Sequence, residues 1–342
     1  MIEQGLTVGE LEKTLGCLWG LALGDAMGMP TEFLTPEEIA SCFGGRVEGL
    51  RVPITSHPRA GCPAGAVTDD TGQAVALAKA LVAHQRLTPG LVAEALVQWA
   101  AEADAFAKGF LGPSTTHALK ALQKGVMPAE AGCQGKTNGG AMRVAAVALV
   151  FRNNWQLLME QTAIACLPTH GTSLAISAAA AVSAAISAAL APGANVDDVL
   201  QAARQGAVAG RDYGCQCWTP LLERRLDLAL DIISRYTRTV DQVRALYELI
   251  GTDMAVSESV ITALALVAVT CGEPMPAIIE AVNMGGDTDT MAAISGAICG
   301  ALRGSRAFDV NLISQVEMVN SLNLKELAIQ LLRTRNTSES RV

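Results

Sequence analysis

The sequence predicts an all-α protein, and three observations carry that prediction. Apolar residues recur mainly at helical spacing, and the apolar runs exceed the roughly four to eight residues typical of strands. Almost no stretch alternates apolar and polar residues as a half-buried strand does. No Pro/Ser/Gly tract or charge run divides the 342 residues, so one domain spanning 1–342 is expected.

Glycine and proline residues mark where the expected helices stop, for example at Pro89-Gly90, Gly112-Pro113 and Pro192-Gly193. The expected helices cover 10–28, 70–86, 90–106, 114–124, 140–152, 156–166, 171–191, 197–208, 220–236, 239–249, 256–271, 275–282, 288–303 and 324–334.

Several of these helices have a recognisable environment. In 70–86, the residues at core-facing spacing are apolar. In 171–191, the uncharged Ala and Ser residues indicate a closely packed buried helix rather than a membrane span. In 220–236, Arg224-Arg225 beside acidic residues indicates a solvated face. In 288–303, Gly296 and Gly300 allow another backbone to approach closely, at a cost in helix stability.

Composition and charge exclude several classes of protein. A net charge of −8 and an aromatic content of 4% supply neither the basic surface nor the stacking side chains of a nucleic-acid-binding protein. The N-terminal segment is acidic where a secretory signal is basic, so a cytoplasmic protein is expected. Nine cysteines without paired spacing predict free or buried thiols, and Cys215-Gln216-Cys217 lacks the spacing of a zinc knuckle.

Two acidic motifs far apart in the chain precede helix-like runs. One is the segment 283–290, which reads NMGGDTDT, and the other is 67–71, which reads VTDDT. Either motif alone is explained as well by a helix N-cap as by a metal site. Together they indicate a cation-binding site, because adjacent carboxylates repel one another unless a positive charge lies between them. Their oxygen-only ligands suit Mg²⁺, Mn²⁺ or Ca²⁺, and no EF-hand glutamate follows, so the metal must be bound across the fold.

Five motifs in order make the chain resemble the ADP-ribosylhydrolases of the dinitrogenase-reductase-activating glycohydrolase type, a family that includes a crystallin. They are GCLWGLALGDAMGMPTEF at 16–33, TDDT at 68–71, NGGAMR at 138–143, TH at 169–170 and GGDTDT at 285–290. The resemblance implies a compact multi-helix orthogonal bundle with two Mg²⁺ or Mn²⁺ ions. It also implies hydrolysis of an N- or O-glycosidic bond at the anomeric carbon of an ADP-ribosyl group.

The resemblance assigns roles to particular residues. The candidate catalytic residues are Glu32 and Asp70. Glu32 gates the site or assists proton transfer beside the ribose, although by itself it reads as a solvated glutamate. Asp25 either supports the metal ligands or caps its own turn. The implied metal ligands are Thr68, Asp69, Asp70, Asp287, Asp289 and Thr290.

The candidate substrate-binding residues are Asp25, Gly112, Lys136, Asn138, Gly139, Gly140, His170 and Gly286. The loop 135–140 precedes a helix, and by resemblance its N–H groups bind the diphosphate. His170 then lies beside the phosphates or the distal ribose, although a lone histidine is more often structural. Lys136 stands where relatives can place an aromatic residue, so it either pairs with a phosphate or marks a substrate without adenine. The acid that some relatives carry before Gly112 is missing.

Three functional hypotheses follow. The first is a metal-dependent ADP-ribosyl hydrolase acting on a protein side chain or a small conjugate. The second is an N-ribosyl hydrolase for smaller nucleosides or ribosides. The third is a catalytically silent, crystallin-like binding protein, which the intact acidic motifs argue against. The loop of Glu32, Gly44-Gly45 and the stretch 53–65 together are a candidate lid over the site.

Overall fold

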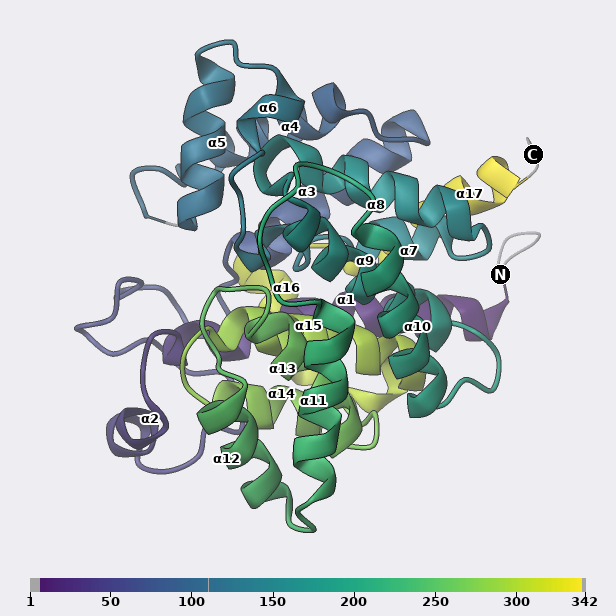
Figure 1. The fold of residues 1–342 in the computed structure, drawn as a ribbon. Helices are drawn as coiled ribbons and strands as arrows, with labels where there is room; N and C mark the ends of the chain where they lie inside the picture. The colour runs from purple at the N-terminus through teal and green to yellow at the C-terminus, as the bar shows by residue number, and fades with distance from the viewer. Residues whose placement is uncertain (1–6, 110, 340–342) are drawn as a thin grey trace.

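The computed structural model describes residues 7–109 and 111–339, and within these ranges the protein is all-α, as predicted (Figure 1). The β structure of the described residues is limited to two isolated bridges, Thr137 with Ala255 and Thr172 with Cys215. In the view of Figure 1, α3 to α8 lie above the central pair α1 and α15, and α11 to α14 lie below it.

The helices of the first half are α1 (Val8–Gly28), α2 (Pro36–Phe43), α3 (Asp69–His84), α4 (Pro89–Glu102), α5 (Pro113–Gln123), α6 (Pro128–Ala131), α7 (Ala145–Phe151) and α8 (Trp155–His170). Those of the second half are α9 (Ser173–Ala189), α10 (Val196–Gly210), α11 (Leu222–Ser234), α12 (Thr239–Leu249), α13 (Ser259–Val269), α14 (Pro274–Val282), α15 (Thr288–Arg303), α16 (Val310–Asn320) and α17 (Leu324–Glu339). Three 3₁₀ turns are η1 (Met29–Thr31), η2 (Asn138–Gly140) and η3 (Ser305–Ala307).

Most predicted helix boundaries agree within a few residues, and four differ more. The helix expected at 324–334 runs to residue 339. The helix expected at 90–106 ends at residue 102, and nearby Asp104 adopts a left-handed φ of 52°. The helix expected at 140–152 begins only at Ala145, because the glycine segment forms the 3₁₀ turn η2. The helix expected at 156–166 continues to His170 through Pro168. Helices α6 and α16 were not predicted, and of α2 only the start at Pro36-Glu37-Glu38 was indicated by the sequence.

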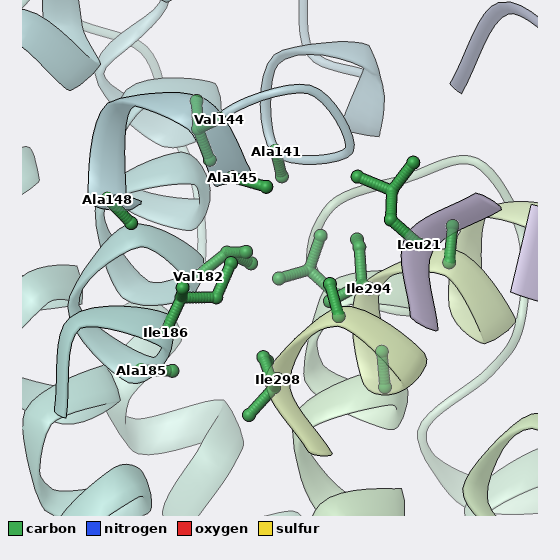
Figure 2. Packing of buried hydrophobic residues seen from close by; sticks show 14 of the residues in the cluster. Leu21, Ala141, Val144, Ala145, Ala148, Val182, Ala185, Ile186, Ile294 and Ile298 are labelled. Carbon is green, nitrogen blue, oxygen red and sulfur yellow. The ribbon is translucent and has the colours of Figure 1, made fainter. Parts of the chain in front are cut away.

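Helix α9 is the buried helix that its Ala and Ser content predicts, with every residue from Ser173 to Ile186 buried. Its side chains Val182 and Ile186 point into the apolar core between α7 and α15, and Ile294 and Ile298 approach from α15 (Figure 2). Within the described part of the chain, none of the helices combines the length and apolar character needed to cross a membrane.

Helices α1 and α15 pack backbone to backbone through small residues. From Gly16 to Gly28 every fourth residue of α1 is a glycine on the contact face, and a methyl group at any of them would overlap the backbone of α15 or of Gly304 just beyond it. The α1 glycines are Gly16, Gly20, Gly24 and Gly28, and their nearest neighbours include Gly300, Gly296, Ala292 and Asp289 respectively. The close approach predicted at Gly296 and Gly300 is therefore confirmed, and its partner is α1.

The prediction of free thiols is wrong for two cysteines. Cys133 and Cys215 form a disulfide, with their Cα atoms 5.5 Å apart, whereas Cys217 is free. The pair could not be predicted from spacing, because 82 positions separate the two residues. The fold brings them together where the Gly171 carbonyl accepts the Cys215 N–H at 2.8 Å.

Candidate active site

The two acidic motifs lie at the starts of two helices and meet in one cavity of about 150 Å³. Thr68 is the N-cap of α3, and its hydroxyl accepts the N–H of Asp70 at 3.2 Å. Asp287 is the N-cap residue of α15, and Asp289 lies in the first turn of that helix. Since the start of a helix carries partial positive charge, both positions favour carboxylates.

Most of the predicted site residues line this cavity, and a few do not. Those that line it are Glu32, Asp69, Asp70, Gly112, Asn138, Gly139, His170, Asp287, Asp289 and Thr290. Asp25, Thr68, Gly140 and Gly286 lie outside the lining, and so does Lys136, which is exposed to solvent. Glu32 is only 6% exposed, so the interpretation of Glu32 as a solvated side chain is wrong.

The glycine turn before Asp287 attaches this motif to the segment that carries Glu32. Gly285 and Gly286 have φ values of 81° and 80°, a left-handed conformation that glycine adopts without strain. The Phe33 N–H donates to the Gly286 carbonyl at 2.8 Å, and the Gly286 N–H donates to the Leu34 carbonyl at 3.0 Å. The turn therefore fixes Glu32 beside the carboxylates at the start of α15.

Asp25 of α1 lies outside the cavity and holds the start of α3 through hydrogen bonds. Its buried carboxylate accepts the N–H groups of Thr68 and Thr71, each at 3.0 Å, and the Thr71 hydroxyl at 2.5 Å. Asp25 therefore supports the first acidic motif rather than capping its own turn.

Three carboxylates form a compact cluster inside the cavity. Single oxygen atoms of Glu32, Asp287 and Asp289 all lie within 4.8 Å of one another, and all three residues are buried. Asp69 and Asp70 line the same space. Among the described residues, Glu32 Oε2 and Asp70 Oδ1 are buried without a hydrogen-bond partner. Burying a carboxylate oxygen without a partner costs free energy, so these two atoms indicate that a ligand binds in the cavity.

Burial raises the pKa values of these carboxyl groups. It raises the pKa of Asp69 to about 7, against the lowering effect of the nearby Arg59 guanidinium. For Glu32, Asp70 and Asp289, burial and then the neighbouring carboxylates raise the pKa well above its usual value. A carboxyl set of this kind holds protons until a cation replaces them.

The donor set fits a hard divalent cation. Carboxylate and hydroxyl oxygens face the cavity, and no described cysteine is among its lining residues. Oxygen ligands suit Mg²⁺ or Mn²⁺ and not the softer metals. A bound cation would satisfy the two unpartnered oxygens and offset the mutual repulsion of the carboxylates. The cluster can therefore hold a metal ion.

The glycine loop forms another wall of the cavity and contacts the acidic cluster directly. Asn138 Nδ2 donates to Asp287 Oδ2 at 2.5 Å and to Ser259 Oγ at 2.8 Å. The Asn138 N–H donates to the Met254 carbonyl at 3.0 Å. Gly139 lies against the ring of His170, where a methyl group would overlap the ring atoms. Glycine is therefore required at this position for the loop to lie beside the histidine.

A buried network of hydrogen bonds connects the acidic cluster to the interior behind the loop. Arg143 is fully buried, and its guanidinium donates to Gln73 Oε1 and to Thr169 Oγ1, both at 2.6 Å. Gln73 Nε2 donates in turn to Asp69 Oδ2 at 3.0 Å. Arg143 therefore orients Gln73, which orients the carboxylate of Asp69.

The same network fixes the tautomer of His170. Thr137 donates its hydroxyl to Ser114 Oγ at 2.9 Å, so Thr137 Oγ1 accepts the N–H of His170 Nε2 at 3.0 Å. In a neutral ring Nδ1 then carries no proton and accepts the hydroxyl of Thr169 at 2.8 Å, while Thr169 Oγ1 accepts from Arg143. Burial, followed by the charge of Arg143, lowers the pKa of His170 well below its usual value. The imidazole is thus neutral and positions the glycine loop.

Sequence reasoning missed Arg59, which also lines the cavity. Its Nε lies 3.9 Å from Glu32 Oε2, and its Nη2 lies 3.9 Å from Asp69 Oδ1. Arg59 belongs to the stretch 53–65, where no motif marks it. The only available signal was its position between Glu32 and the first acidic motif.

Comparisons with known proteins agree with this arrangement. The chain matches the ADP-ribosylglycohydrolase family over residues 7–341. It is 34% identical to the uncharacterized protein YegU of Escherichia coli K12, covering 96% of this chain and 99% of that protein. It is 27% identical to ADP-ribosylhydrolase ARH3 of Bos taurus, covering 86% of each chain.

The fold has a counterpart among solved structures. A chain described as an "ADP-ribosylglycohydrolase-related protein complex" superposes with a TM-score of 0.71 at 24% sequence identity, covering 96% of this chain and 100% of that one. Identity at this level establishes a shared fold. The family match over residues 7–341 is the stronger finding, and it shows that the protein belongs to the ADP-ribosylglycohydrolase family.

Proposed function

We propose that the protein is a metal-dependent hydrolase that cleaves the glycosidic bond between ADP-ribose and a protein side chain or a small conjugate. One observation carries the proposal: a buried, oxygen-only carboxylate cluster stands beside a glycine loop in the same cavity. Membership of the ADP-ribosylglycohydrolase family supports ADP-ribosyl hydrolase activity. The chain therefore has both parts that such a reaction needs, a charged centre for the ribose and a wall for the phosphates.

Two Mg²⁺ or Mn²⁺ ions would be held by the oxygen-bearing residues of both motifs, Thr68, Asp69, Asp70, Asp287, Asp289 and Thr290. Such ions, when bound, supply positive charge that orients the ribose hydroxyls and the attacking water. Asp25 holds the first motif in place, and Asn138 holds Asp287. These contacts keep the ligand oxygens together before the substrate arrives.

The reaction is a hydrolysis at the anomeric carbon. The water oxygen forms a bond to that carbon while the bond to the nitrogen or oxygen of the leaving group breaks, and the bonding pair stays with the leaving group. One water proton must reach the leaving group for the charges to balance. Glu32 is the proposed proton carrier, because its Oε2 is buried in the cavity without a hydrogen bond. Neutral His170 does not serve this purpose, since it is already bonded at both nitrogens.

The proposed diphosphate site is the glycine loop. Thr137, Asn138 and Gly139 of this loop line the cavity, and the His170 ring packs against Gly139 and bonds Thr137, which holds the loop in place. A second candidate function, an N-ribosyl hydrolase for smaller ribosides, is favoured by the small volume of the cavity, about 150 Å³, and by the exposed position of Lys136 outside it.

The test combines hydrolysis with binding. We expect purified protein to release ADP-ribose from ADP-ribosylated peptides with Mg²⁺ or Mn²⁺, to lose this activity in EDTA, and to regain it when the metal is restored. Asp289→Ala should abolish hydrolysis while circular dichroism shows an unchanged helical content. Calorimetry with ADP-ribose and with ribose 5-phosphate separates the two candidate functions. Metal-dependent binding of ribose 5-phosphate alone would favour the riboside hydrolase, and binding of neither would contradict both.

A further inference from the structure

Glu32 enters the cavity from a short segment whose backbone is strained. Phe33 has a φ of 64°, a left-handed value that a side chain of this size rarely adopts. Such a conformation persists only where neighbouring groups hold it. The peptide group between Glu32 and Phe33 is bound at both ends. Its N–H donates to the Gly286 carbonyl at 2.8 Å, and its carbonyl oxygen accepts from His57 Nε2 at 3.0 Å.

The side chain of Glu32 depends on this backbone for its position. Its Oε2 atom is buried without a hydrogen-bond partner, and Nε of Arg59 lies 3.9 Å away, which is longer than a hydrogen bond. Oxygen atoms of Asp287 and Asp289 lie within 4.8 Å of its carboxylate, and like charges at this distance repel one another. The contacts of the backbone therefore decide whether Glu32 stays in the cavity or turns away from the other carboxylates.

His57 links the segment of Glu32 to the stretch 53–65. The Arg59 N–H donates to His57 Nδ1 at 3.1 Å, so Nδ1 carries no proton and the proton of the neutral ring lies on Nε2. His57 Nε2–H then donates to the Glu32 carbonyl oxygen at 3.0 Å. His57 is 5% exposed, so both bonds are shielded from water. One ring nitrogen thus holds the loop of Arg59, and the other holds the backbone of Glu32.

The loop that carries His57 is itself anchored on both sides. Before it, the Val47 N–H donates to Asn283 Oδ1, and Asn283 Nδ2 donates to the Val47 carbonyl, each at 2.8 Å. At its far end, Asn320 Nδ2 donates to the Gly65 carbonyl at 2.8 Å. His57 therefore projects from an anchored loop and can restrain the strained segment of Glu32.

We infer that His57 is a positioning residue for the reaction and holds the carboxyl group of Glu32 in the cavity. The inference rests on the proposed function, in which Glu32 carries the proton. His57 lies outside the cavity lining, and both of its ring nitrogens are already bonded, so it does not contact the reacting atoms. It acts on the rate of the chemical step rather than on the binding of the metal or of the ADP-ribosyl group.

The experiment separates the two bonds of His57. In His57→Gln the side-chain amide nitrogen can replace Nε2 and donate to the Glu32 carbonyl. In His57→Asn the shorter side chain keeps an acceptor for the Arg59 N–H but does not reach Glu32. His57→Ala removes both bonds. His84→Gln, the same change at an exposed histidine, is the matched control and should behave as wild type.

We expect kcat on an ADP-ribosylated peptide with Mg²⁺ to follow the bond to Glu32. It should fall at least about tenfold in His57→Asn and His57→Ala, and stay within about threefold of wild type in His57→Gln. The affinities for Mg²⁺ and ADP-ribose, measured by calorimetry, should be unchanged in all three variants. Circular dichroism confirms that each variant is folded, and if His57→Ala fails to fold, the Gln and Asn variants still give the comparison.

Two further measurements distinguish positioning of Glu32 from a general structural role. In a Glu32→Gln background, His57→Ala should lower kcat by less than about twofold, because the group that His57 positions has already been removed. Hydrogen exchange of the segment 32–35 should be at least about tenfold faster in His57→Asn and His57→Ala than in wild type or His57→Gln.

The outcomes that overturn the inference differ from failure of the proposed function. The inference is wrong if His57→Gln loses as much activity as His57→Asn, or if the losses of Glu32→Gln and His57→Ala multiply in the double variant. It is also wrong if the affinity for ADP-ribose falls in step with kcat. If wild type hydrolyses no ADP-ribosylated substrate, the proposed function fails, and the exchange rates decide alone. Equal exchange of the segment 32–35 in wild type and His57→Asn would then show that His57 does not hold Glu32.

Discussion

At the residue scale, Arg143 is a charged residue behind the site whose burial depends on hydrogen bonds. Its charge is fully buried, and it is held by Gln73, Thr169 and the Ala165 carbonyl. Burial lowers the pKa of Arg143 to about 10, which still leaves the guanidinium charged near neutral pH. The residue connects the orientation of Asp69 with the tautomer of His170, and so acts on the site without entering the cavity.

Replacing Arg143 should therefore cost more than replacing an arginine on the surface. Arg143→Met leaves the buried oxygens of Gln73, Thr169 and Ala165 without donors, and we expect the free energy of unfolding to fall by about 3–5 kcal/mol. Arg244→Ala is the control, because its ion pair with Glu248 is exposed to solvent and its loss should leave the free energy of unfolding nearly unchanged. Urea unfolding monitored by circular dichroism measures both. Equal losses in the two variants would contradict a structural role for the network.

The residues that the sequence predicts best are those that lie together in one motif. Asp287 and Asp289 are two positions apart at the start of the same helix, so both reach the cavity once that helix is in place. Arg59 could not be predicted, because its partners Glu32 and Asp69 lie in separate segments and only the fold brings them together. Pairing of this kind depends on distances that sequence patterns do not contain.

At the element scale, the contact of α1 with α15 determines where the second acidic motif lies. Gly28 at the end of α1 faces the backbone of Asp289, so the close packing of the two helices reaches the site itself. The sequence showed the small residues of α15 but not their partner, since the periodic glycines of α1 also suit a helix that packs elsewhere. Helix α16 was missed because only Ile313 and Val316 of it are buried, which leaves a weak apolar pattern.

A methyl group on the contact face of α1 should separate the two helices. In Gly20→Ala the new Cβ would overlap the carbonyl of Gly296, a backbone group that cannot move aside alone. We expect a loss of at least about 3 kcal/mol in the free energy of unfolding. Gly9→Ala is the matched control in the same helix, because nothing lies within 4 Å of its added Cβ, and it should gain up to about 1 kcal/mol. Chemical denaturation of both variants tests this, and a neutral Gly20→Ala would show that the helices separate easily.

At the scale of the whole molecule, the site draws on both ends of the chain. Asp25 and Glu32 come from the first helix and the segment after it, and Asp287 and Asp289 come from α15. We propose that residues 1–342 form one domain, because a site assembled in this way requires both ends to fold together. Folding therefore brings several carboxyl groups into one buried space, and without cations their repulsion acts against the folded state.

The stability of the metal-free protein should consequently depend on pH. Burial raises the pKa of Asp69 to about 7 and that of Asp25 to about 6, compared with about 3.9 in an unfolded chain. Between pH 4 and pH 7 the folded protein then binds more protons than the unfolded chain. The stabilising contribution of these groups is complete below about pH 4 and is lost as the pH rises to about 7.

We expect metal-free protein to be at least about 2 kcal/mol less stable at pH 8 than at pH 5, as measured by chemical denaturation in EDTA. Asp69→Asn removes one raised group and should flatten this dependence. Mg²⁺ at about one hundred times its dissociation constant should restore about 2.7 kcal/mol at pH 8, because it binds only the folded carboxylates. A metal-free protein that is equally stable at both pH values, and that Mg²⁺ leaves unchanged, would show that these carboxylates are not held together in the buried cavity.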